Sequence, residues 1–393
     1  MLLATGWGAN QFTPMLLVYR RALGLSTGTV EAMFGFYALG LIPGLLLSGP
    51  VSDARGRRIV VLPAAALSLL ASLVLVAGES SVALLFVGRL LAGVSSGVVF
   101  GCGTAWVREA SLPPTGTAEP AVAARRAAVA MTVGFGLGPL VAGLLGQWAA
   151  EDRVVPYLPH IVLMAAVLLA LRNAPEMAAR APKMPVRVSL PGVGDRRFRT
   201  VVAPMAPWVF AAPAIAFALL PSVVGADRLP DGIALTAAIT ALTALAGVFI
   251  QPFARRLDRH GTGSRAALAG LLALAVGLVL GAITSEAQQA WLLVPCAVVL
   301  GCAYGLCLVA GLIEVQRIAE PRALARLTAA FYALTYVGFA APFVLALAAH
   351  LVSYSVLLLV AAAISLLTAV VVTRGATRVS STGYSRGLDA QHS

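Results

Sequence analysis

The sequence predicts an all-α membrane protein with twelve transmembrane helices in two six-helix bundles. Of 393 residues, 60% are hydrophobic and 11% are charged, whereas soluble domains carry about 25% charged residues. Lipid offers backbone groups no hydrogen-bond partner, so a crossing segment is either a helix of ~20 apolar residues or a strand of a closed barrel. Long apolar runs, rather than weak alternation in ten-residue segments, favour helices.

Twelve apolar runs are long enough to cross a bilayer, and only two charged residues, Glu31 and Arg89, lie inside them. We expect spans at 2–19, 28–50, 59–78, 82–104, 127–150, 154–171, 201–225, 232–254, 266–285, 287–313, 327–349 and 351–373.

The basic residues predict the orientation of the chain. With a cytoplasmic N-terminus, the inward loops and the tail hold 23 of the 28 Lys and Arg residues, and the outward loops hold four: Arg20, Arg21, Arg153 and Arg228. Basic residues favour the cytoplasmic side of membrane spans. We therefore expect a multi-pass protein of the cell membrane with both termini in the cytoplasm. The net charge of +12 reflects this orientation, and we expect no nucleic-acid partner.

Metal, cofactor and nucleotide chemistry is not indicated. The four histidines are scattered without metal-ligand spacing. A phosphate loop needs a lysine in a soluble strand-to-helix setting, and Lys183, the only lysine, lies in a polar segment. We expect no metal, no cofactor and no enzymatic activity, and ATP is not the expected energy source.

The cysteines and the N-terminus fit a membrane-embedded chain. All four cysteines fall within expected spans, where small buried residues are typical: Cys102, Cys296, Cys302 and Cys307. The first apolar run begins at residue 2 without a basic segment before it and ends in "FTPMLLVYRR". This is not the pattern of a cleavable signal peptide.

A proline-rich and basic segment divides the chain into two halves. Residues 172–200 contain four prolines and seven basic residues, and prolines disfavour one continuous helix. We expect four parts, which are an N-terminal six-helix bundle, a cytoplasmic linker, a C-terminal six-helix bundle and a cytoplasmic tail: 1–172, 173–200, 201–373 and 374–393.

The two halves carry matching marks, which indicates an internal repeat. The pattern G-x-x-x-D-x-x-G at 49–56 recurs as A-x-x-x-D-x-x-G at 254–261, 205 residues later. Pro139 in span five corresponds to Pro342 in span eleven, 203 residues later.

The stretch "GPVSDARGRR" at 49–58 resembles the loop signature of the major facilitator superfamily, G-x-x-x-D-x-x-G-R-R/K, at every fixed position: Gly49, Asp53, Gly56, Arg57 and Arg58. The span count, linker and repeat extend the resemblance over nearly the whole chain. It implies two bundles around a central cavity that opens alternately to each side. That fold needs only one chain, so we expect a monomer.

We predict a conformational latch at this loop. Gly49 allows close helix approach and Gly56 a tight turn. Asp53 is expected near the positive N-terminus of span eleven, where Pro321 suits a first helical turn. The arginine pair is expected to meet Glu109 at the inner end of span four. Positive-inside anchoring is the alternative, but it explains neither the aspartate nor the glycines.

Arg89 and Glu31 are the candidates for proton coupling. An intramembrane arginine costs ~2.5–3.5 kcal/mol and usually faces a cavity or a partner, although it can also snorkel to the interface. "GRLLAGVSSG" resembles the span-four signature R-x-x-x-G of the family, beginning at Arg89 and Gly93, which implies a role in proton coupling. A guanidinium stays charged, so a carboxylate has to carry the proton. Glu31 lies in the same outer half of the membrane, where an arginine would tune it, unless it is only an interfacial residue.

The resemblance implies that spans one, four, seven and ten line the cavity. We therefore predict that the substrate cavity contains amide and aromatic side chains from these spans and from span eleven: Trp7, Asn10, Gln11, Trp208, Tyr304, Tyr332 and Tyr336. Helix packing is the alternative role for each of them.

Span five contains "GFGLGPLVAG". Gly134 and Gly138 permit close helix approach, and Pro139 bends the helix. The stretch, which ends at Gly143, resembles the signature of the drug:proton antiporter branch, G-x-x-x-G-P-x-x-G-G, with Ala142 in place of one glycine.

Together these features predict a proton-coupled secondary transporter that exports a small amphipathic molecule by alternating access. Its partners would be the substrate, protons and the lipid bilayer. A facilitator or uptake symporter for a sugar or organic acid is an alternative within transport. A membrane sensor or scaffold without flux is an alternative of another class.

Overall fold

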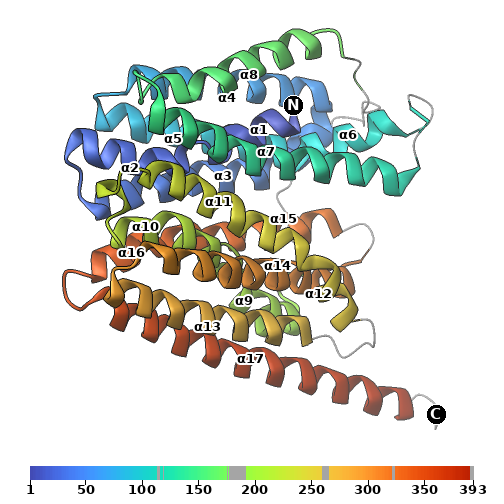
Figure 1. Ribbon diagram of the computed structural model, residues 1–393. Helices are drawn as coiled ribbons and strands as arrows, with labels where there is room; N and C mark the ends of the chain where they lie inside the picture. Colours follow the sequence, from blue (N-terminus) through green and yellow to red (C-terminus); the bar gives the residue numbers. More distant parts are fainter. Residues whose placement is uncertain are drawn as a thin grey trace.

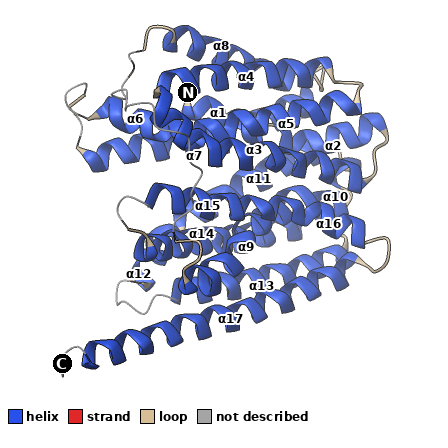
Figure 2. Ribbon diagram, turned by 180° about the vertical axis from the view of Figure 1, so that it is seen from behind, coloured by secondary structure: helices blue, strands red, loops and turns tan. Residues whose placement is uncertain are grey.

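The computed structural model describes residues 1–112, 116–117, 119–174, 176, 192–258, 265–320 and 324–389. Throughout these ranges the regular structure is helical (Figures 1 and 2). Ten helices of this part of the chain are long and apolar enough to cross a membrane, and Val155–Leu171 is a shorter apolar helix.

The first half of the chain forms α1 to α8: α1 (Leu2–Asn10), α2 (Phe12–Leu23), α3 (Thr27–Arg55), α4 (Arg57–Ala77), α5 (Val82–Val98), α6 (Thr104–Ser111), α7 (Pro120–Trp148) and α8 (Leu158–Leu171). A π-helical turn, η1 (Val99–Gly103), joins α5 to α6 without a break.

The second half forms α9 to α17: α9 (Ala203–Ala214), α10 (Leu220–Val223), α11 (Gly232–Phe249), α12 (Gln251–Leu257), α13 (Arg265–Ala287), α14 (Leu293–Ile318), α15 (Leu324–Val337), α16 (Ala341–Ala348) and α17 (Tyr354–Asp389). The π-helical turns η3 (Phe198–Val202) and η4 (Ile215–Leu219) flank α9, and a 3₁₀ turn, η7 (Gly338–Ala340), joins α15 to α16.

The ten long helices coincide with ten of the expected spans. The other two expected spans differ from a long helix. The first is interrupted at Gln11, where α1 ends before α2 begins. The second, at 154–171, begins as a short 3₁₀ turn and continues as the 14-residue α8. The ten long helices do not by themselves establish the expected count of twelve.

The helices lie in two groups, each containing one half of the chain (Figures 1 and 2). The N-terminal group is α1 to α8, drawn blue to green in Figure 1, and the C-terminal group is α9 to α17, drawn yellow-green to red. We call the end of the molecule with α6 and α12 the linker end, because residues 172–174 and 192–197 adjoin it. The end with the α2–α3 turn is the opposite end.

Glycines on both helices bring the backbones of α3 and α5 into close contact. A Cβ atom on Gly93 would lie 2.0 Å from the carbonyl oxygen of Tyr37, and one on Gly97 would lie 2.2 Å from that of Leu41. In the reverse direction, a Cβ atom on Gly40 would lie 2.3 Å from a backbone oxygen of α5. Small residues permit such close approach in membranes, where packing drives helix association.

The glycines of span five also make the close contacts that the sequence predicted. Gly134 and Gly138 face α1, where added Cβ atoms would lie 2.2 Å from the oxygen of Leu3 and 2.5 Å from that of Trp7. Gly143 faces the C-terminal group, because its Cβ atom would lie 2.3 Å from the Cβ of Ala237. One helix, α7, therefore packs closely on both groups.

We predict that Gly93→Ala will lower the free energy of unfolding by about 1–3 kcal/mol, the usual cost of overpacking, because α3 would have to move away from α5. Gly136→Ala is the matched control, since a Cβ atom at Gly136 meets nothing within 4 Å. We expect the control to be neutral or slightly stabilising, because alanine favours the helix. Unfolding of the purified protein in mixed micelles measures both, and equal stability of the two variants would contradict the close contact.

Candidate functional site

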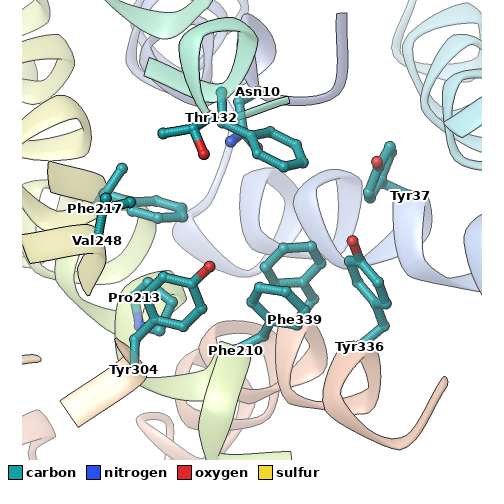
Figure 3. Close-up of a pocket in the computed structure, with 12 residues that line it drawn as sticks. Asn10, Tyr37, Thr132, Phe210, Pro213, Phe217, Val248, Tyr304, Tyr336 and Phe339 are labelled. Carbon is teal, nitrogen blue, oxygen red and sulfur yellow. The ribbon is translucent and has the colours of Figure 1, made fainter. Parts of the chain in front are cut away.

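A pocket lies between the two groups of helices (Figure 3). It receives side chains from α1, α3 and α7 of the N-terminal group and from α9, η4, α11, α14, α15 and η7 of the C-terminal group: Asn10, Tyr37, Thr132, Phe135, Phe210, Pro213, Phe217, Ala244, Val248, Tyr304, Tyr336 and Phe339. Aromatic rings dominate this list, and none of these side chains carries a formal charge.

Phe210 is at the centre of the aromatic wall. Its ring lies 4.5 Å from that of Tyr336, 5.2 Å from that of Phe339 and 5.7 Å from that of Tyr304, between centroids. Such offset pairs stabilise the position of each ring. In Figure 3 the hydroxyls of Tyr304 and Tyr336 point into the space that Asn10 approaches from the other group.

Three of the sequence-predicted cavity residues line this pocket: Asn10, Tyr304 and Tyr336. Tyr37 and Phe210 also line it, and the sequence analysis did not select them. Phe210 and Phe217 lie seven residues apart on the same face of one span, but a buried packing face has the same spacing. The spacing of these aromatic residues is visible in the sequence, but it does not show whether their rings line a pocket or pack against another helix.

The other four predicted cavity residues are not among those that line it: Trp7, Gln11, Trp208 and Tyr332. The Nε2 atom of Gln11 donates to Ser72 Oγ at 3.0 Å, within the N-terminal group. The Nε1 atom of Trp208 donates to Thr368 Oγ1 on α17 at 3.2 Å. These two side chains bond to neighbouring helices and connect each group internally.

Arg89 is buried directly behind the pocket wall. Its side chain is 1% exposed, and its guanidinium donates three hydrogen bonds of 3.4 Å to the backbone carbonyls of Ala9, Met33 and Phe34. The guanidinium also lies 4.7 Å from the ring centroid of Phe12 and 4.6 Å from that of Tyr37, which are cation–π distances. Arg89 therefore does not snorkel to the interface.

Glu31 is fully buried, and neither of its carboxyl oxygens has a hydrogen-bond partner among the residues that the structure describes. The sequence predicts that Arg89 tunes this acid, but no ion pair joins Glu31 to Arg89 in the described structure. The charge of Arg20, rather than that of Arg89, acts on the Glu31 carboxyl. Arg20 itself crosses to the C-terminal group, where it donates to the carbonyl of Ser222 at 2.7 Å and lies 3.6 Å from Asp227.

Gln147 makes a second connection between the groups at the opposite end. It lies in the last turn of α7, and its Nε2 atom donates to the carbonyl of Pro230 at 2.7 Å. Its Oε1 atom accepts hydrogen bonds from the backbone amides of Ile233 and Ala234, at 3.1 and 3.2 Å. These amides belong to the first turn of α11, and the backbone amides of a first turn have no hydrogen-bond acceptor within their own helix. A side chain of the N-terminal group therefore caps a helix of the C-terminal group.

At the linker end, the "GPVSDARGRR" loop forms an ion network. Arg57 lies 2.5 Å from Asp53 and 3.0 Å from Glu109, the second of which was expected from the sequence. Gly56 has a φ of 105°, which favours glycine, and forms the predicted turn. Glu176 accepts the backbone hydrogen of Arg57 at 2.7 Å and thereby caps α4.

Other parts of the expected latch have different positions. The side chain of Asp53 is 66% exposed and pairs with Arg57 of its own group, and Pro321, its expected neighbourhood, lies outside the described residues. Arg58 donates to the backbone carbonyl of Arg172. A Cβ atom at Gly49 would meet nothing within 4 Å, so this glycine makes no close helix contact here.

The C-terminal group has a related network. Glu314 is fully buried and pairs with Arg197 and with Arg317, the latter at 2.8 Å. Glu314 follows Glu109 by 205 residues, the same offset as in the sequence repeat. Burial raises the pKa of the nearby Asp258, and Arg317 opposes that shift.

The family model described as Major Facilitator Superfamily matches residues 1–257, well over half of the chain. The chain belongs to the Major Facilitator Superfamily. It is therefore a multi-pass membrane transporter of that type, which binds small-molecule substrates within a bilayer, and not an enzyme. No curated protein matches its sequence significantly.

Solved structures share the fold of this superfamily member. A mutant of the nucleoside transporter NupG is 16% identical, with a TM-score of 0.74, over 95% of this chain and 97% of that one. A POT family transporter in complex with 5-aminolevulinic acid is 12% identical, with a TM-score of 0.75, over 96% and 95%. A bacterial homolog of the human lysosomal transporter Spinster, inward-facing and unoccupied, is 14% identical, with a TM-score of 0.65, over 96% and 93%. At these identities the likeness concerns the fold alone.

We predict that Gln147→Ala will open the opposite end of this transporter. Loss of a helix cap costs about 1 kcal/mol, which corresponds to about a fivefold change in a population ratio. Spin labels at Arg21 and Leu229, which belong to different groups, would report a longer distance in the variant by pulsed EPR, in a background without the native cysteines. Gln289→Ala, an exposed amide at the same end, is the control. An unchanged distance distribution in Gln147→Ala would mean that the cap does not hold this end closed.

Proposed function

We propose that this superfamily member is a proton-coupled secondary transporter of the drug:proton antiporter type, which exports a small amphipathic molecule by alternating access. The observation that carries the proposal is Glu31, a buried acid that has no hydrogen-bond partner among the described residues. It is subject to the charge of Arg20, the arginine that bonds the N-terminal group to the C-terminal group. It connects protonation with the closure of one end of the molecule.

The topology that we propose has twelve spans in two bundles, 1–172 and 201–373. The two additional crossings are the interrupted pair α1–α2 and the segment Val155–Leu171. The linker end faces the cytoplasm, because most basic residues belong to it, and both termini lie on that side of the cell membrane. A single chain contains both bundles and the whole pocket, which supports a monomer.

The coupling follows from the cost of burying charge. An ionised carboxylate without a partner is very unfavourable in a dry environment, so the opposite end closes over Glu31 more easily when its carboxyl is protonated. When that end opens, water reaches Glu31 and favours loss of the proton, and Arg20 leaves Asp227. A ligand shifts a conformational equilibrium toward the state that binds it more tightly. The proton is such a ligand, because Glu31 binds it more tightly when the opposite end is closed. Protons from outside therefore favour the closed state of that end.

Arg89 has a positioning role in this proposal. Its hydrogen bonds join α5 to α1 and α3, and α3 holds Glu31 two residues before Met33. Because Glu31 and Tyr37 lie on the same helix, a movement of α3 at Glu31 also moves Tyr37 in the pocket wall. This contact is the physical basis for the coupling role that Arg89 is expected to have.

Transport in proteoliposomes tests the proposal. The substrate is first identified by a growth and accumulation screen with diverse toxic compounds, in cells with and without the protein. An imposed pH gradient should then move this substrate against its concentration, in the direction opposite to the protons. Movement with the protons would indicate an uptake symporter, movement indifferent to the gradient a facilitator, and no movement of any compound a sensor or scaffold.

We predict that Glu31→Gln will abolish proton-driven transport and retain substrate binding within about threefold, because the amide resembles the protonated acid and the pocket is unchanged. A threefold change in affinity is below 1 kcal/mol. Glu151→Gln, an exposed acid at the same end, is the matched control and should transport normally. Normal proton-driven transport by Glu31→Gln would show that this acid does not carry the coupling proton.

A further inference from the structure

The pocket has a definite electrostatic character. Its polar groups are the amide of Asn10, the hydroxyl of Thr132 and the hydroxyls of three tyrosines, and no acidic side chain lines it among the described residues. Its apolar surface is mainly aromatic. A ligand in this pocket finds stacking surfaces and neutral hydrogen-bonding groups, but no carboxylate to neutralise a positive charge.

Arg89 brings an unneutralised positive charge close to this wall. Its guanidinium bonds to the carbonyl of Ala9, next to Asn10 in the chain, and lies over the ring of Tyr37. The partners of the guanidinium in the described structure are backbone carbonyls and aromatic rings, with no ion pair to an acid. Glu31, the buried acid of the same span as Tyr37, is likewise not in contact with it.

We propose that the pocket selects flat aromatic molecules that are neutral or singly negative and excludes cations. This inference rests on the proposed function, in that it takes the pocket as the substrate site. The ring of the ligand stacks on Phe210, and its hydroxyl, carbonyl or carboxylate group bonds to Asn10, Tyr304 or Tyr336, whose polar ends face the same space in Figure 3.

Two physical effects oppose a cation in this place. The guanidinium repels it through a medium of low dielectric constant, where charge interactions are strong. The ring of Tyr37, which would otherwise attract a cation, already has the guanidinium of Arg89 over it. A neutral or anionic ring of the same size meets neither cost, and a negative group gains from the same charge.

Equilibrium binding to the purified full-length protein tests this charge selection without any transport step. The probes are 2-naphthalenemethanol, 2-naphthoate and 2-naphthylmethyl-trimethylammonium, which share one ring system and differ in charge. We expect the first two to bind and the cation to bind at least about tenfold more weakly, which corresponds to about 1.4 kcal/mol. Equal or tighter binding of the cation would overturn the proposal, and so would the absence of binding by all three.

Variants assign the selection to Arg89. Arg89→Gln should reduce the difference between the neutral probe and the cation to less than about threefold, whereas Arg89→Lys keeps the charge and should retain it. An unchanged difference in a correctly folded Arg89→Gln protein would contradict the role of this charge. Helical circular dichroism and size-exclusion profiles establish folding.

A second pair of variants tests the stacking surface. Phe210→Leu should weaken binding of the neutral probe and the anion by about tenfold, in the range measured for the loss of one aromatic contact. Phe86→Leu removes a ring outside the pocket and should change neither. Equal affinities in the two variants would show that Phe210 is not the stacking surface. A failure of proton-driven transport with intact charge selection would reject the proposed function alone.

Discussion

The backbone contact between α3 and α5 is the constraint on which the rest of the site depends. Because the glycines of the two helices leave no room for side chains, Arg89 on α5 lies within reach of the carbonyls of Met33 and Phe34 on α3. The same helix α3 contains Glu31, the pocket residue Tyr37 and the first seven residues of the "GPVSDARGRR" stretch, Gly49 to Arg55. One helix, held close to α5 by several glycines, therefore connects the acid, the arginine and the pocket wall.

The helix α7 has a comparable position between the two groups. Its glycines at 134 and 138 contact α1, which holds Asn10, and Gly143 contacts α11 of the other group. The contact with α1 lies within the N-terminal group, where these glycines bring the two backbones together. The contact with α11 crosses between the two groups and includes Gly143 and the side chain of Gln147. Relative movement of the two groups is thus expected at α11 rather than at α1.

The sequence predicts those features that depend on local composition or on a short motif. Hydrophobic run length located ten long helices, and the loop motif located the turn at Gly56 and the pair of Arg57 with Glu109. It could not predict that the charge of Arg20 acts on Glu31, because Arg20 lies beyond the end of its expected span and its contacts are made across the two groups. Nor could it select Phe210, because aromatic residues on a buried helix face have the same spacing whether they pack against another helix or line a pocket.

The cap that Gln147 provides for α11 has a consequence for the transport cycle. The first amides of α11 donate hydrogen bonds to a side chain of the other group. These hydrogen bonds exist only while the two groups stay together. In the alternating-access cycle that we propose, the first turn of α11 exchanges a protein acceptor for water when the opposite end opens, and closure removes that water again. The hydration of a single helical turn therefore contributes to the relative free energies of the two proposed states.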